Sequence, residues 1–187
     1  MRVTKLFIIT SILAVILCSS AFGASKSELK LMSVFVSNFI EVGMSNFEAD
    51  SLSNGELAHF GIWHNYRNNF KSRIRRCPDK NCPYGSLIID KKYVAESVKK
   101  YFNRNIKHTS TQHEHFDGDF YHFDGADGDN QQARVYEVKR EDGIIYMSGE
   151  TYYPDFEDLE GVPFTAAAKP YKYNGKNTWY ILSLETE

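Results

Sequence analysis

The chain has few of the motifs and residue excesses that assign a function directly. It lacks GxSxG, HExxH, P-loop and dinucleotide-binding patterns, so no motif indicates a common hydrolase, a nucleotide-binding protein or a cofactor. It also lacks an excess of Lys and Arg, because 22 basic residues stand against 24 acidic ones. Binding to nucleic-acid phosphates requires a positive surface, and we therefore expect no nucleic-acid partner. Beyond the N-terminal segment, no apolar run is long enough to cross a membrane.

The N-terminal segment has the pattern of a secretory signal peptide. Arg2 and Lys5 precede an uncharged apolar run over residues 6–17, and small residues follow. We expect residues 1–23 to be removed, which would leave an exported protein in the periplasm or outside the cell. The alternative is a lipoprotein anchored through Cys18. Lipoprotein signals place a small residue before the cysteine, whereas a leucine stands there in this chain, so we favour a soluble exported protein.

Only two of the three cysteines, Cys77 and Cys82, remain after that removal, and both lie in the short stretch CPDKNC. In an exported protein, two cysteines in one turn are typical of a disulfide, which we therefore expect. Closing so small a loop would add about 2 kcal/mol of stability. Half of a zinc site and a redox pair are the alternatives. Zinc needs two further ligands, and redox motifs usually have the spacing CxxC.

Apolar residues recur at helical spacing in three parts of the chain, over residues 28–43, 56–74 and 91–102. Capping boxes, each formed by a serine and a glutamate three residues later, open the first two helices. The third helix follows a short strand and is capped by Asp90. Trp63 lies on the apolar side of the second helix, and we expect its ring to anchor the core.

After the third helix the apolar pattern changes to a period of two, which is typical of β-strands. Three hairpins are expected, over residues 114–123, 133–152 and 165–184, with turns at Asp117-Gly118, Asp142-Gly143 and Asn174-Gly175. Such residue pairs readily adopt the positive φ angles of a two-residue type I′ turn.

The central hairpin gives the most specific register. A turn at Asp142-Gly143 would place Val138 opposite Met147 and Tyr136 opposite Gly149. An aromatic ring opposite a glycine fills the gap that the missing side chain leaves. We expect this face of the hairpin, with both Tyr136 and Val138, to be buried under the helices.

This order of elements predicts an α+β fold in which three N-terminal helices pack on a curled antiparallel sheet, a meander of hairpins. We expect residues 24–187 to form a single domain. The order resembles the cone-shaped folds of the nuclear-transport-factor-2-like and cystatin-like groups. The stretches VFVSNFIEV (34–42) and HFGIWHNYRNNF (59–70) are also similar to a group of exported bacterial proteins of unknown function. This second resemblance implies a shared fold and secretion, and it carries over no catalytic residue.

Three histidines are candidate metal ligands. With the predicted turn at Asp117-Gly118, His113 would lie opposite His122, and His115 would lie on the same face of the hairpin. Three imidazoles this close could hold Zn²⁺ and leave one coordination position to water. The alternative is a polar strand face in solvent, because no carboxylate can be placed behind the histidines and Glu114 points to the opposite face.

Aromatic side chains with one polar edge are abundant in the second half of the chain, and such rings suit contact surfaces. We expect a non-enzymatic domain that binds a small ligand or a protein partner on an aromatic-rich face of the sheet. The candidate ligand-binding residues are Tyr146, Tyr152, Tyr171, Trp179 and His64. The alternative is a hydrolase or metalloenzyme whose pocket contains a histidine, because residues distant in the sequence meet in a fold.

Overall fold

The computed structural model describes residues 24–68, 72–126, 131–156 and 159–187. The predicted signal peptide, residues 1–23, lies outside the described residues, as do residues 69–71 of the predicted second helix. In chain order the described elements are α1 (Lys26–Ile40), β1 (Phe47–Glu48), a 3-10 turn (Ala49–Ser51), α2 (Asn54–Arg67), β2 (Ile74–Arg76), β3 (Leu87–Asp90), α3 (Lys91–Phe102), β4 (His115–Phe116), β5 (Phe120–Phe123), β6 (Gln132–Glu141), β7 (Ile144–Tyr152), β8 (Pro163–Tyr173) and β9 (Lys176–Thr186).

The fold is α+β, but the predicted arrangement of three N-terminal helices on one curled sheet is wrong. The helices are interspersed among the strands, because β1 precedes α2, and β2 and β3 separate α2 from α3. The strands form two antiparallel sheets instead of one meander. Strands β1 and β2, which were missed, have two and three residues, too few to show an alternation of apolar and polar side chains.

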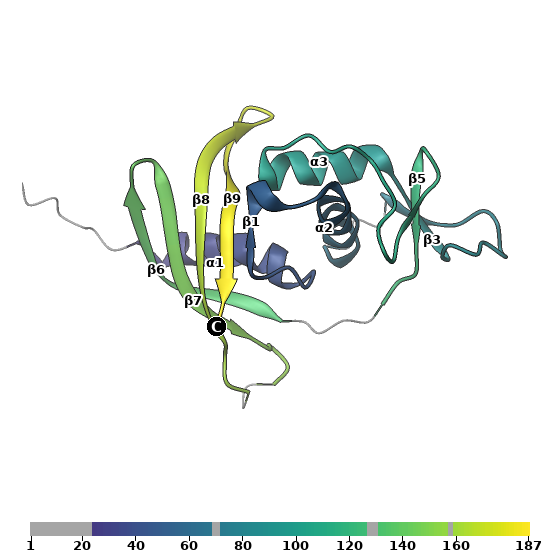
Figure 1. Cartoon of the computed structure of the whole chain (residues 1–187). Helices are drawn as coiled ribbons and strands as arrows, with labels where there is room; N and C mark the ends of the chain where they lie inside the picture. Colours follow the sequence, from purple (N-terminus) through teal and green to yellow (C-terminus); the bar gives the residue numbers. More distant parts are fainter. Residues whose placement is uncertain (1–23, 69–71, 127–130, 157–158) are drawn as a thin grey trace, which may run out of the picture.

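The larger sheet has the strand order β1-β9-β8-β7-β6, and α1 packs on one of its faces along β6 (Figure 1). Two serines of α1 also bind the edge strand. The hydroxyls of Ser33 and Ser37 accept hydrogen bonds from the backbone N–H groups of Val135 and Ala133, each at 2.9 Å. These bonds satisfy donors that an edge strand would otherwise leave without a partner.

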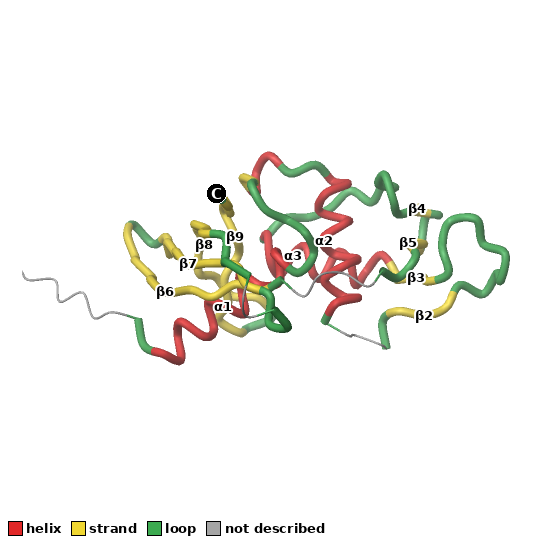
Figure 2. Tube along the Cα trace, turned by 90° about the horizontal axis from the view of Figure 1, so that it is seen from below, coloured by secondary structure: helices red, strands yellow, loops and turns green. Residues whose placement is uncertain are grey.

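The smaller sheet has the order β2-β3-β5-β4 and lies at the other end of the molecule, with α2 and α3 between the two sheets (Figures 1 and 2). Buried apolar side chains form two clusters. The larger cluster joins all three helices to the larger sheet, and the smaller one joins α2 and α3 to β3 and β5. Trp63 is half-buried and contacts both clusters, so it bridges two cores and does not lie at the centre of one.

Helix boundaries follow local signals at their starts but not at the end of α2. Ser53 and Glu56 form the predicted capping box, in which each side chain accepts a hydrogen bond from the other residue's backbone N–H. The helix ends at Arg67, and not at residue 74, because Ile74 begins strand β2. Ile74 has the sequence spacing of the apolar stripe of α2, but it is not part of that helix. Asp90 caps α3 as predicted.

The two turns predicted in the larger sheet are correct, since Asp142, Gly143, Asn174 and Gly175 all have positive φ. Val138 pairs with Met147, also as predicted. A β-bulge directly after Val135 then shifts the register, so that Val135 and not Tyr136 lies opposite Gly149. Tyr136 is consequently 55% exposed, and the prediction that its ring is buried is wrong.

The turn of the β4–β5 hairpin lies one residue later than predicted, at Gly118-Asp119. The carboxylate of Asp117 accepts hydrogen bonds from the backbone N–H groups of Asp119 and Phe120, at 2.9 and 2.7 Å. This side-chain turn fixes Asp117 as the residue before the loop. The strands therefore pair His115, and not His113, with His122.

Candidate functional site

A buried carboxylate holds two side chains of α2. Glu114 is 2% exposed, and its Oε1 lies 2.9 Å from Nδ1 of His59 and 2.7 Å from Nε1 of Trp63. Its second oxygen accepts a hydrogen bond from the hydroxyl of Thr111. His59 and Trp63 are four residues apart and thus lie on one face of the helix. Glu114 is the residue directly before β4, and its side chain reaches both of them.

These hydrogen bonds keep Glu114 ionised despite its burial. Burial alone would raise the pKa of the carboxyl, but the hydrogen bonds from His59, Thr111 and Trp63 outweigh it and lower the pKa to about 2. The ionised carboxylate favours the His59 tautomer that carries its proton on Nδ1. In that tautomer Nε2 carries a lone pair that can accept a hydrogen bond, and it has no hydrogen-bond partner among the described residues.

A cavity of about 320 Å³ opens beside this pair. Its lining includes His59, Trp63, Glu41, Arg67, Ile40, Val42 and Tyr153. The guanidinium of Arg67 lies over the Trp63 ring, 5.8 Å from its centroid, and the buried Nε of Arg67 has no hydrogen-bond partner in the described part of the chain. Burial raises the pKa of Glu41 in spite of the nearby charge of Arg67. The cavity therefore brings together a cation, an imidazole and a carboxyl group.

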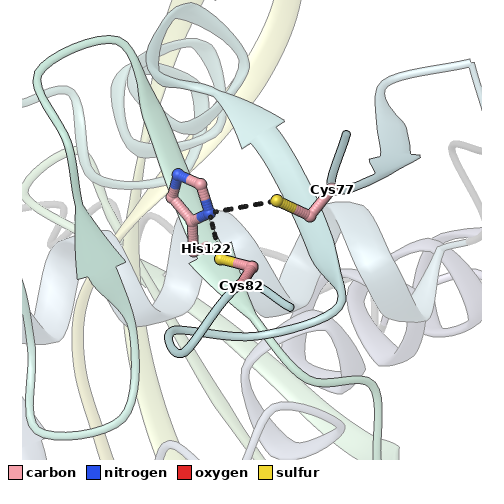
Figure 3. Close-up of side chains that lie close together, drawn as sticks. All are labelled: Cys77, Cys82 and His122. Atoms are coloured by element: carbon pink, nitrogen blue, oxygen red, sulfur yellow. Dashed lines mark hydrogen bonds between the residues drawn. The ribbon is translucent and has the colours of Figure 1, made fainter. Parts of the chain in front are cut away.

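A second group of reactive side chains lies in the smaller sheet. Cys77 and Cys82 are free thiols, so the predicted disulfide is absent from this structure. Their Sγ atoms lie 3.7 and 3.3 Å from Nδ1 of His122 on β5, and both thiols face that imidazole (Figure 3). The two sulfurs and the nitrogen all lie within 4.8 Å of one another.

The opposite nitrogen of the same ring binds a carboxylate. Nε2 of His122 lies 2.8 Å from Oδ2 of Asp117. Partial burial alone would lower the pKa of His122, but the bonds to Asp117 and to the Cys82 thiol outweigh it and raise the pKa. Asp117 thus fixes both the turn of the hairpin and the orientation of the imidazole.

The three histidines predicted to bind metal do not meet. His115 and His122 are neighbours, with ring centroids 6.1 Å apart, and His115 stacks on Tyr84 at 3.7 Å. His113 is exposed and joins no group of metal-ligating side chains among the described residues. The shifted hairpin turn is the reason, because it places His115 opposite His122 in the position predicted for His113.

The predicted ligand-binding tyrosines lie apart from one another. Tyr146 is exposed and lines a cavity of about 340 Å³ on the larger sheet. Tyr152 donates a hydrogen bond to Gln132 at 2.9 Å. The hydroxyl of Tyr171 binds the backbone carbonyls of Lys99 and Lys100 at the end of α3. These positions do not form one aromatic surface.

Trp179 and His64 pack against side chains of the larger cluster. The ring of Trp179 meets that of Phe35 edge to face, with centroids 5.9 Å apart. His64 is 3% exposed and stacks on Phe60 at 5.3 Å, and its Nδ1 lies 3.0 Å from Nδ2 of Asn68. Burial is the main reason why the pKa of His64 falls to about 3, which makes the imidazole neutral in the fold.

Two residues of the larger site were not found from the sequence. The sequence pattern did not mark His59 as a site residue, and it placed Glu114 on the strand face opposite the histidines. The available signal was the spacing of His59 and Trp63 on one helix face, beside a glutamate in a strand of apolar period. Their meeting depends on how α2 packs against the segment before β4, which spacing does not reveal.

Comparisons of the chain with protein-family models, with curated proteins and with solved structures found no match in any of the three. The resemblances inferred from the element order and from residues 34–42 and 59–70 therefore stay predictions. No helix in the described part of the chain is long and apolar enough to cross a membrane.

Proposed function

We propose that this protein is an exported domain that binds a small organic anion in the cavity beside His59. The observation that carries the proposal is the guanidinium of Arg67, which lines the cavity and lies over the Trp63 ring. A ligand carboxylate or phosphate would accept hydrogen bonds from this cation with the geometry that guanidinium favours. A cavity thus replaces the aromatic sheet face as the proposed binding site.

The remaining walls favour a ligand that also has an apolar body. Ile40, Val42 and the Trp63 ring contribute apolar surface, and a volume of about 320 Å³ suits a ligand of one or two rings. Glu41 also lines the cavity, where burial disfavours its negative charge and raises its pKa in spite of the nearby charge of Arg67.

Fluorescence of Trp63 provides the test. The chain has two tryptophans, so a Trp179→Phe background leaves Trp63 as the only reporter, inside the cavity. We expect benzoate and phenyl phosphate to change its emission saturably, and benzyl alcohol, a neutral molecule of similar shape, to have little effect. Arg67→Gln should abolish the response, whereas Arg76→Gln, at an exposed position on β2, should retain it. Equal binding in the Arg67→Gln and Arg76→Gln proteins would contradict the proposal.

A hydrolase is the second candidate function, and the His59–Glu114 pair favours it. A carboxylate that fixes one imidazole nitrogen leaves the other as a general base, here at the edge of a cavity that holds a substrate-sized volume. Hydrolysis of 4-nitrophenyl acetate should fall in His59→Gln and, through kcat more than KM, in Glu114→Gln. His113→Gln, which removes an exposed imidazole, controls for the intrinsic reactivity of histidine. Equal rates in the His59 and His113 variants would exclude this role.

A further inference from the structure

The cysteine-containing loop is built to approach His122. This loop joins β2 to β3, and the backbone N–H of Cys77 donates to the carbonyl of Ser86 at 2.8 Å across its base. Gly85 has a φ of +134°, and a Cβ at this position would lie 2.4 Å from the backbone carbonyl carbon of Phe123. Only glycine permits so close a contact. The loop therefore lies directly on β5, beside the residue that follows His122.

The distances from the His122 nitrogen to the two sulfurs are close to those in a tetrahedral metal site. Zn–S bonds of about 2.3 Å and Zn–N bonds of about 2.0–2.1 Å place tetrahedral donors about 3.5–3.8 Å apart. Nδ1 of His122 lies 3.3 Å from the sulfur of Cys82 and 3.7 Å from that of Cys77 (Figure 3). Four residues separate the two cysteines, a spacing found in zinc sites.

The imidazole is oriented as a metal ligand. Nε2 of His122 lies 2.8 Å from Oδ2 of Asp117, so Nε2–H donates a hydrogen bond to the carboxylate and Nδ1 presents its lone pair to the thiols. Histidines that bind zinc commonly have such a carboxylate behind them. The sequence alone could not place this carboxylate, because the predicted turn gave Asp117 a different position.

We propose that Cys77, Cys82 and His122 bind one Zn²⁺ ion, with Asp117 as the carboxylate that orients the histidine. Two thiolates and an imidazole are ligands that suit zinc, whereas calcium and magnesium prefer oxygen ligands. No fourth His, Cys, Asp or Glu of the described residues joins the group at this spacing, which leaves the fourth coordination position to water. Binding would release the two thiol protons, so the affinity for zinc should rise with pH.

The zinc site is independent of the proposed function, since it shares no residue with the cavity beside His59. A bound zinc ion would link the loop between β2 and β3 to strand β5, because Cys77 and Cys82 lie in the loop and His122 lies on the strand. The same three residues also explain why two nearby cysteines in an exported chain need not form a disulfide. Zinc and oxidation compete for the same thiolates.

Cobalt provides a spectroscopic test. The purified full chain, reduced and kept under anaerobic conditions, is titrated with Co²⁺. We expect one equivalent to give the thiolate-to-cobalt charge-transfer band and the intense visible bands of tetrahedral cobalt, and Zn²⁺ to displace it. Cys77→Ser, Cys82→Ser and His122→Gln should each lose or strongly weaken these bands, while His113→Gln should titrate like the parent. Circular dichroism of each variant without metal checks that it is folded.

Two further measurements separate this site from its alternatives. Asp117→Asn should keep the stoichiometry but weaken zinc binding by about 10- to 100-fold, as expected for loss of the orienting carboxylate. In zinc-loaded protein the thiols should resist alkylation until a chelator is added. Thiols that react only after a reductant would reveal a disulfide and overturn the proposal. Undiminished cobalt binding by the His122→Gln variant would overturn it as well.

Discussion

Trp63 and Glu114 are joined by a hydrogen bond of 2.7 Å at the place where the two hydrophobic clusters of the molecule meet. The Trp63 ring packs edge to face against Phe123 of the smaller cluster, with centroids 6.0 Å apart, and also contacts the larger cluster. The bond to Glu114 fixes the orientation of this ring. The polar contact with Glu114 therefore helps to couple the two clusters, against both of which Ile106 also packs.

Replacement of Glu114 tests this coupling. Glu114→Ala removes the acceptor for Trp63, His59 and Thr111, and we expect it to lower the free energy of unfolding by about 3 kcal/mol. Glu114→Gln should cost less, because its amide oxygen still accepts from Trp63. Urea unfolding at pH 7 measures both changes, with the exposed Glu141→Ala as control. An unfolding midpoint of Glu114→Ala equal to that of the control would show that the bond does not stabilise the fold.

Acid should destabilise the protein through His64. Its pKa is 6.5 when unfolded and about 3 in the fold, so below pH 6.5 the unfolded chain binds a proton that the folded chain does not. The contribution of neutral His64 to the free energy of unfolding is then complete above pH 6.5. It is lost as the pH falls toward 3, by up to about 1.4 kcal/mol per pH unit. Between pH 6.5 and 5 most of the Glu114 carboxyl groups are still ionised, so measurements in this range report on His64. His64→Gln should flatten this slope and exposed His113→Gln should not; identical slopes would show that His64 titrates normally in the fold.

Local rules in the sequence predicted the parts of the fold that local interactions determine. The capping box at Ser53 and the turns at Asp142-Gly143 and Asn174-Gly175 depend on neighbouring residues alone, and all three are correct. The face of Tyr136 was predicted by extending a period of two through the strand. The bulge after Val135 interrupts that period, and nothing in the alternation marks it.

The candidate sites were less predictable, because each depends on contacts between distant segments. Glu114 meets His59 only when the segment before β4 packs on α2. Cys82 meets His122 because β5 pairs with β3, the strand that follows the cysteine loop. The residue opposite His122 depends in turn on the hairpin turn at Gly118-Asp119, since a displacement of that turn by one residue exchanges His115 for His113. The cysteines and the histidine were each recognised as possible ligands, but in separate groups.

Tyr171 gives a prediction that separates packing from ligand binding. Its hydroxyl lies 2.9 Å from the carbonyl oxygen of Lys99 and 2.5 Å from that of Lys100, in the last turn of α3, where the Lys99 carbonyl also accepts a hydrogen bond from the backbone N–H of Asn103. Tyr171→Phe should therefore lower the free energy of unfolding by about 1 kcal/mol. Thermal and urea unfolding measure the loss, and Tyr146→Phe, at an exposed ring, is the control. An unchanged stability of Tyr171→Phe would return this hydroxyl to the candidates for ligand binding.

Two glycines of α2 should respond to alanine in opposite directions. A Cβ at Gly61 would lie 2.7 Å from Cγ1 and 2.9 Å from the carbonyl oxygen of Val94 on α3, so the helices would have to move apart. A Cβ at Gly55 would meet only the hydroxyl of Ser53, at 3.7 Å. We expect Gly61→Ala to lower the free energy of unfolding by about 1–3 kcal/mol, the usual cost of overpacking.

Gly55→Ala should instead raise stability by up to about 1 kcal/mol, because alanine favours the helix and meets open space. Both substitutions add the same methyl group to the same helix, so their difference isolates the contact between α2 and α3. Urea unfolding of the two variants and the parent measures it. The close packing of Gly61 on Val94 is contradicted if the two variants are equally stable, since the propensity gain alone would then account for both.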